Sequence, residues 1–63
     1  LRAYREIIGL AAAQMKPGAY LVLEIGYDQR REVSDLLSEV GFADLDVRRD
    51  LGGHDRALSG RKL

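Results

Sequence analysis

The stretch Tyr20-Leu21-Val22-Leu23-Glu24-Ile25, bounded by glycines at positions 18 and 26, decides the fold. Five of its six residues are apolar or aromatic, and they do not alternate with polar ones. Such a run is typical of a strand covered on both faces, as in the parallel sheets of α/β proteins. A chain of 63 residues has little material for that cover, and it begins at Leu1, without an initiator Met, inside a helical pattern. We therefore expect residues 1–63 to be a piece of a larger domain.

The composition argues against several classes of protein. Ten basic and ten acidic residues cancel, so no clustered positive field is expected to attract nucleic acid or an anionic membrane. No apolar run approaches the ~20 residues of a membrane span, and nothing resembles a signal peptide. The chain has no Cys and one His, too few for a disulfide or a zinc site. We expect a soluble, intracellular protein without nucleic-acid or membrane partners, whose near-zero charge does little to keep copies apart.

The first two-thirds of the chain predict two helices around the apolar strand. Apolar residues recur at helical spacing over residues 1–16, and Pro17 ends that helix. We expect Asp28 to cap the start of a second helix and Gly41 to end it in a left-handed conformation, with Phe42 packing back on Leu37. The buried stripe of this helix is predicted to be Val33, Leu36, Leu37 and Val40.

The last third predicts two paired strands. Residues 44–50 alternate, with Leu45 and Val47 on one side, as in a half-buried strand near a sheet edge. Residues 51–55 contain two glycines and predict a reversal, after which residues 56–62 return as an antiparallel strand. Gly60 would allow a close approach of a neighbour. The predicted order is helix-strand-helix-strand-strand, an α/β unit.

Two single residues have both a functional and a structural interpretation. Glu24, inside the apolar strand, is either a buried acid near a ligand or a residue at the sheet margin that pairs or reaches solvent; we favour the second. His54 is either a general base or a solvated side chain in a glycine-rich turn, and again the second is favoured.

The remaining candidates surround the same turn. Asp50, Asp55 and Arg56 are expected to form an ion pair that pins it, in preference to a substrate-facing arginine. Tyr27 is expected to pack as a lid over the start of the second helix. The two glycines of the turn lie between strands, so they do not form a dinucleotide-binding loop. No residue makes an independent case for catalysis, and we assign no catalytic, cofactor-binding or metal-binding residue to this chain.

Two stretches carry a resemblance to a known family. They are Lys16–Gln29, which contains Leu-Glu-Ile-Gly-Tyr-Asp-Gln, and Val47–Arg56, which contains Arg-Asp-Leu-Gly-Gly-His-Asp-Arg. With the helix that ends Val-Gly-Phe between them, they resemble the C-terminal end of the HemK-like protein-glutamine methyltransferases that modify peptide chain release factors. The resemblance covers essentially the whole chain.

The resemblance implies the C-terminal part of a Rossmann-like class I methyltransferase sheet. Its last strand would insert, antiparallel, between the two before it and form a mixed three-stranded sheet. The parent would transfer a methyl group from S-adenosylmethionine to a glutamine side-chain amide of a release factor. Members of the family bind the cofactor through a glycine-rich loop and hold the glutamine with Asn-Pro-Pro-Tyr. Neither motif occurs in residues 1–63, so the piece alone should be inactive and bind no cofactor.

Two alternatives remain open. Another class I methyltransferase could share the fold, because a fold does not fix a function. A stand-alone interaction module is also possible, in which the strand at residues 20–25 pairs with another copy. In either case the isolated chain is expected to self-associate through this strand or by exchange of its first helix.

Overall fold

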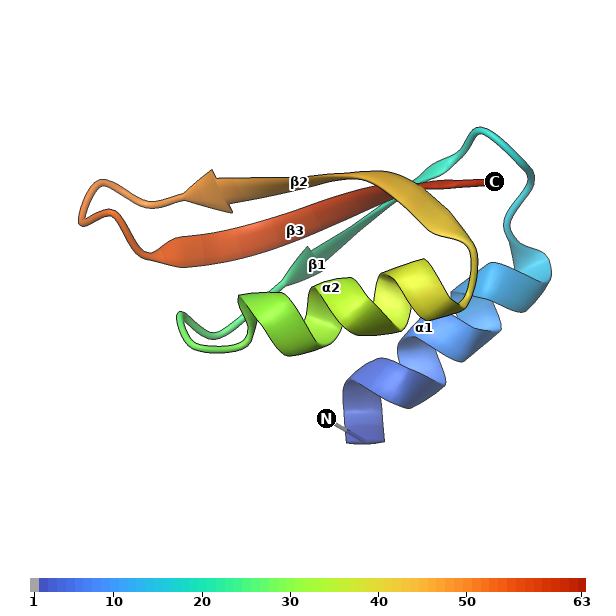
Figure 1. The fold of residues 1–63 in the computed structure, drawn as a ribbon, viewed down its shortest axis with the longest axis horizontal. Coiled ribbons are helices and arrows are strands. Elements are labelled where there is room, and N and C mark those ends of the chain that lie inside the picture. The colour runs from blue at the N-terminus through green and yellow to red at the C-terminus, as the bar shows by residue number, and fades with distance from the viewer. Residues whose placement is uncertain (1) are drawn as a thin grey trace.

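The computed structural model describes residues 2–63, which form two helices and three strands. In chain order these are α1 (Arg2–Gln14), β1 (Tyr20–Glu24), α2 (Arg30–Glu39), β2 (Phe42–Arg49) and β3 (Asp55–Lys62) (Figure 1). The predicted order helix-strand-helix-strand-strand is confirmed. Leu1, which was expected to begin the first helix, lies outside the described residues.

The strands form one sheet in the order β1-β3-β2, in which β3 is antiparallel to both neighbours. The last strand therefore lies between the two that precede it, as the resemblance implied. The prediction of a mixed sheet is wrong. β1 and β2 run in the same direction, but β3 separates them, so residues 2–63 contain no parallel pair.

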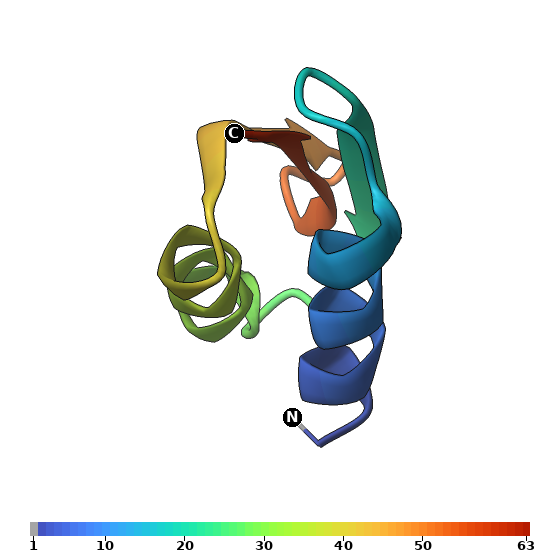
Figure 2. The same cartoon turned by 90° about the vertical axis from the view of Figure 1, so that its right-hand side faces the viewer.

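The two helices pack on the same face of the sheet (Figure 2), so within residues 2–63 the strand that was predicted to have two covered faces has only one of them covered. Leu23 and Ile25 are buried in the core and Leu21 packs against it. Tyr20 and Val22 are 61% and 65% exposed on the opposite face. The residues alternate in burial although they do not alternate in polarity, because within this chain only one layer of helices is present to cover them.

A single apolar core joins all five elements. Its buried members are Ile8, Leu23, Ile25, Val33, Leu36, Leu37, Phe42 and Leu58. The predicted stripe of α2 is confirmed except for Val40, which ends the helix and is exposed. Burying a side chain of this kind contributes about 1.5–3 kcal/mol, so the eight together supply the main driving force for folding.

The two ends of α2 differ in how well the sequence predicted them. Asp28 does not cap the helix; Gln29 is the N-cap residue, and it makes no side-chain capping hydrogen bond. At the other end Gly41 has φ +95° and donates its N–H to the Ser38 carbonyl at 3.3 Å, as a left-handed C-cap should. Phe42 then enters the core that contains Leu37, so this boundary is confirmed.

Gly60 lies where β2 bulges over β3. Two residues of β2, Asp44 and Leu45, lie opposite the single residue Gly60, because the pairing steps from Ala43–Arg61 to Asp46–Ser59. A Cβ atom on Gly60 would lie 2.8 Å from Leu45 Cδ2. The close approach predicted at this glycine is confirmed.

Candidate functional site

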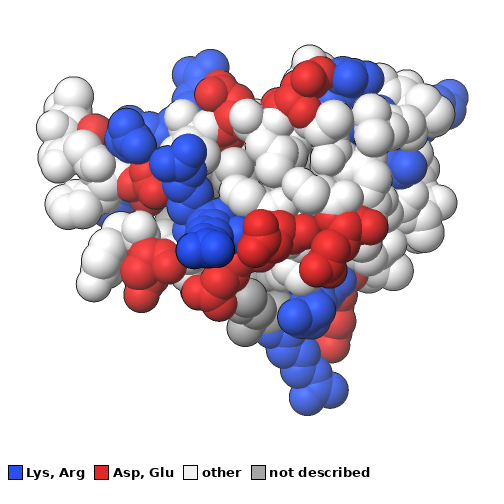
Figure 3. Space-filling view, in the orientation of Figure 1, with Lys and Arg blue, Asp and Glu red and all other residues white. Residues whose placement is uncertain are grey.

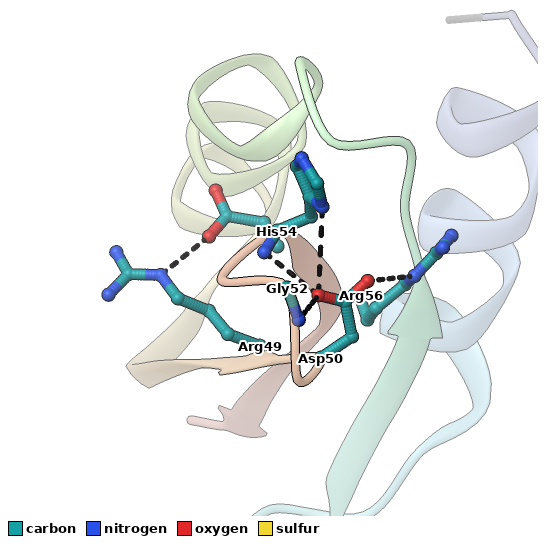
Figure 4. Close-up of polar contacts among 6 residues, drawn as sticks. Arg49, Asp50, Gly52, His54 and Arg56 are labelled. Atoms are coloured by element: carbon teal, nitrogen blue, oxygen red, sulfur yellow. Dashed lines mark hydrogen bonds and ion pairs between the residues drawn. The ribbon is translucent and has the colours of Figure 1, made fainter.

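The turn between β2 and β3 gathers most of the polar residues that the sequence singled out (Figure 4). The Asp50 carboxylate lies at its centre. Its Oδ1 accepts the backbone N–H groups of Gly52 at 2.9 Å and His54 at 3.0 Å, and its Oδ2 accepts Arg56 Nε at 3.0 Å. Gly53, at φ +81°, allows the chain to reverse around this carboxylate. The turn is thus organised by one side chain that binds three donors.

These hydrogen bonds lower the pKa of Asp50 below its ordinary value. The backbone N–H of His54 makes the largest contribution to this lowering of the pKa. Desolvation is the second-largest effect and opposes it, while the Arg56 side chain and the Gly52 N–H add smaller lowering contributions. His54 Nδ1 lies 3.7 Å from Asp50 Oδ1. The carboxylate is therefore held in its charged form as an anchor for the turn.

A second ion pair closes the base of the same turn. Arg49 Nε donates to Asp55 Oδ1 at 3.0 Å, and β2 pairs with β3 at these two residues. The expected pinning of the turn by Asp50, Asp55 and Arg56 is confirmed, although the structure divides it into two pairs, Asp50–Arg56 and Arg49–Asp55. Because the Nε of Arg56 is engaged by Asp50, the alternative of a free, substrate-facing arginine is not supported.

His54 is solvated, as favoured from the sequence, and its imidazole faces an aromatic neighbour that was not foreseen. The ring of Tyr27 meets it edge-on with centroids 6.0 Å apart. Tyr27 is 71% exposed, so the prediction that it packs as a lid over α2 is wrong. Its ring turns toward the β2–β3 turn, and the chain between β1 and α2 thus lies beside that turn.

Glu24 ends β1 at the sheet margin with its side chain exposed, which confirms the structural interpretation and contradicts the buried acid. Its backbone carbonyl accepts a hydrogen bond from the Tyr4 hydroxyl at 2.8 Å. The same hydroxyl lies 3.2 Å from Gln29 Oε1, which also accepts the N–H of Gly26 at 2.9 Å. This network fixes the end of β1 to both helices.

Tyr4 falls on the apolar side of the helix predicted over residues 1–16, and this network was not predicted. A signal was available, since a tyrosine on a core-facing stripe needs a partner for its hydroxyl. The partner itself could not be identified, because it is a backbone carbonyl twenty residues away along the chain.

The face of the sheet opposite the helices holds a shallow depression of about 200 Å³, and its lining mixes apolar and charged side chains. The lining residues are Tyr20, Val22, Asp46, Arg48, Ala57 and Ser59. It contains no His or Cys, and within residues 2–63 no three His, Asp or Glu side chains gather as a metal site would require. This surface is suited to contact with another chain segment.

On the face shown in Figure 3, basic and acidic side chains are interspersed, so this face presents no continuous basic field. In the part of the chain that the structure describes, neither helix is long and apolar enough to cross a membrane.

Comparison with known proteins gives a consistent result for almost the whole chain. It is 42% identical over 62 residues to a protein of Fusobacterium nucleatum subsp. nucleatum named release factor glutamine methyltransferase, covering 98% of this chain. Proteins with the same name from Burkholderia pseudomallei and Cereibacter sphaeroides are 48% and 46% identical over 61 residues, 97% of this chain. The resemblance drawn from the sequence is confirmed.

The matched region is only a part of each relative. The chain spans 18%, 21% and 22% of the lengths of these three proteins, and the match lies in their C-terminal part. No protein-family model matches the chain, and no solved structure matches it.

Proposed function

We propose that residues 1–63, which are similar to the C-terminal part of release factor glutamine methyltransferases, form the C-terminal portion of the catalytic domain of such an enzyme. The observation that carries the proposal is the similarity, at 42–48% identity over at least 97% of the chain, to three relatives that share this name. The wider domain is a Rossmann-like class I methyltransferase that acts in the cytoplasm.

The reaction of the whole protein is methyl transfer from S-adenosylmethionine to the side-chain amide nitrogen of a glutamine in a peptide chain release factor. The cofactor and the target glutamine bind outside this chain, since it carries neither a strand-linked glycine-rich loop nor Asn-Pro-Pro-Tyr. Isolated residues 1–63 bind no cofactor and are inactive. The geometry of the β2–β3 turn supports the lack of activity, because Asp50 and Arg56 form an ion pair with each other.

The contribution of this chain is then structural. β1 supplies a strand with one edge open within residues 2–63, and Tyr20 and Val22 leave apolar surface on the sheet face away from the helices. Both surfaces suit the addition of further strands and a second layer, as in a doubly wound sheet. Tyr4 and Gln29 hold the end of β1, the end at which open α/β sheets bind their ligands.

A different class I methyltransferase would have the same requirement for a C-terminal sheet, so the fold does not distinguish it. The shared name of the relatives favours the glutamine-modifying family. A stand-alone interaction module is the alternative outside the enzyme class, and the open edge of β1 is the feature that favours it.

The first test is to read the coding region upstream of Leu1 and then assay the complete protein. We expect one reading frame that contains a glycine-rich loop after a strand and Asn-Pro-Pro-Tyr. We also expect the purified product to transfer labelled methyl groups from S-adenosylmethionine to a release factor. A release factor with the target glutamine replaced by alanine is the matched control and should stay unlabelled. A start codon directly before Leu1 would favour the stand-alone module and refute the proposal.

A further inference from the structure

The loop of residues 26–29, between β1 and α2, is closed by two hydrogen bonds that join its first and last residues. Gln29 donates its backbone N–H to the Gly26 carbonyl at 3.0 Å, and Gln29 Oε1 accepts the N–H of Gly26 at 2.9 Å. A Cβ atom on Gly26 would lie 3.1 Å from the same Oε1, so the side chain of Gln29 lies close against the backbone of the loop. One side chain therefore defines much of the conformation of this loop.

The Tyr4 hydroxyl ties the loop to α1. It lies 2.8 Å from the Glu24 carbonyl and 3.2 Å from Gln29 Oε1. Together with the Gly26 N–H, the hydroxyl gives Gln29 Oε1 two donors, which matches the two lone pairs of an amide oxygen. All of these contacts join residues of this chain to one another, so they do not depend on what surrounds residues 1–63 in a longer protein.

The loop lies at the end of the sheet where a ligand is expected. It follows the carboxyl end of β1, and open α/β sheets bind their ligands outside the carboxyl ends of the strands. The β2–β3 turn lies at the same end (Figure 1), and the ring of Tyr27 in the loop meets the ring of His54 in the turn with centroids 6.0 Å apart. The loop and the turn thus form one surface, and a surface built from two backbone segments is suited to a polypeptide.

We propose that Tyr4 and Gln29 are positioning residues for the release factor in the complete protein. They hold the loop of residues 26–29 in the conformation that receives the protein substrate, so the substrate does not have to order the loop when it binds. A binding surface that is ordered in advance saves the entropy that binding would otherwise cost. This inference rests on the proposed function and deepens it, because it names residues of this chain that act on substrate binding through the loop.

The test uses the complete protein that contains residues 1–63, with Tyr4→Phe as the first variant. This substitution keeps the ring and removes only the hydroxyl. The loss of one hydrogen bond shifts an equilibrium by about 2- to 13-fold. We expect the KM for the release factor to rise and the exchange of the Gly26 amide to become faster, each by a factor in this range. The kcat and the dissociation constant of S-adenosylmethionine should stay unchanged.

Three further variants separate positioning from a general loss of stability. Gln29→Ala removes the acceptor of the Gly26 N–H and should raise the KM for the release factor at least as much as Tyr4→Phe. Gln29→Glu keeps an acceptor oxygen in the same place and should have a KM close to that of the original protein. Ile8→Val is the matched control, because it removes one methylene from a fully buried residue of α1 and lowers stability by a similar amount without touching the loop. Its KM should be unchanged.

Three results would overturn the proposal and leave the proposed function intact. In the first, Tyr4→Phe and Gln29→Ala methylate the release factor with the original KM. In the second, they lose affinity for S-adenosylmethionine instead, which would assign the loop to the cofactor. In the third, Ile8→Val raises the KM as much as Tyr4→Phe does, which would make the effect one of stability. If the original complete protein transfers no methyl group to a release factor, the proposed function is wrong and this inference fails with it.

Discussion

Replacing Gly60 by alanine tests the closest approach of a neighbouring side chain to any glycine of the chain. The added Cβ would lie 2.8 Å from Leu45 Cδ2 and 3.2 Å from Phe42 Cβ. The Leu45 methyl group can move, but Phe42 Cβ is attached directly to the backbone of β2 where it pairs with β3. Overpacking of this kind costs about 1–3 kcal/mol, while the loss of glycine flexibility in the unfolded chain returns about 0.5–1 kcal/mol. We expect a net loss of about 1 kcal/mol in the free energy of unfolding, the difference between the middles of these two ranges.

That loss is a large share of the total, since a chain of this length has about 3–9 kcal/mol of stability. Urea unfolding followed by circular dichroism should show a lower midpoint with an unchanged slope. Gly9→Ala is the matched control, because Gly9 lies in α1 with nothing within 4 Å of an added Cβ. There the same substitution should stabilise the chain by about 0.5–1 kcal/mol. If Gly60→Ala is as stable as the original chain, the bulge does not pack as described.

Three further substitutions test the core, the end of β1 and the turn. Leu58→Ala removes a fully buried side chain at the centre of the sheet and should cost about 2–5 kcal/mol in chemical denaturation. Tyr4→Phe should cost about 0.5–1.5 kcal/mol and speed exchange of the Gly26 amide in NMR, because the hydroxyl that binds Glu24 and Gln29 is lost. The pKa of Asp50 is lower in the folded chain than its ordinary value of 3.8. Its stabilising effect should therefore be complete above about pH 4 and disappear as the pH falls through the folded pKa. In Asp50→Asn, the free energy of unfolding should depend less on pH below about pH 4. If the pH dependence of stability there is the same as in the original chain, Asp50 does not anchor the turn.

The sequence predicted the elements whose signals are local. The ends of α2 illustrate the difference between a strong signal and a weak one. Gly41 is the residue type that a left-handed C-cap requires, and the structure has it there. Asp28 was a reasonable N-cap by residue type, but Gln29 takes the position and turns its side chain back to Gly26. Several residue types can occupy an N-cap, whereas a left-handed C-cap strongly favours glycine. The C-terminal end of α2 was therefore easier to predict than its N-terminal end.

Two features that differ from the prediction, the cover of β1 and the strand directions in the sheet, depend on the segments that surround β1. Residues 20–25 predict two covered faces, and within this chain only the face of Leu23 is covered. The expected mixed sheet is wrong because β3 lies between β1 and β2 and is antiparallel to both, so no two parallel strands are neighbours within residues 2–63.

In the candidate site, the pairing of Asp50 with Arg56 followed from their proximity in a short turn. Two features could not be predicted in this way. The position of Tyr27 beside His54 depends on the path of two loops, and the bond from Tyr4 to Glu24 depends on how α1 packs beneath β1.

The most direct test of the proposed function is a chimera. The C-terminal segment of the Burkholderia pseudomallei enzyme that matches this chain over 61 residues is replaced by the corresponding residues of this chain. Methyl transfer from labelled S-adenosylmethionine to a release factor is then measured. We predict that the chimera methylates the release factor glutamine, whereas the same chimera carrying Leu58→Asp, which places a charge in the core, does not. A soluble, folded chimera that binds the cofactor and transfers no methyl group would contradict the account.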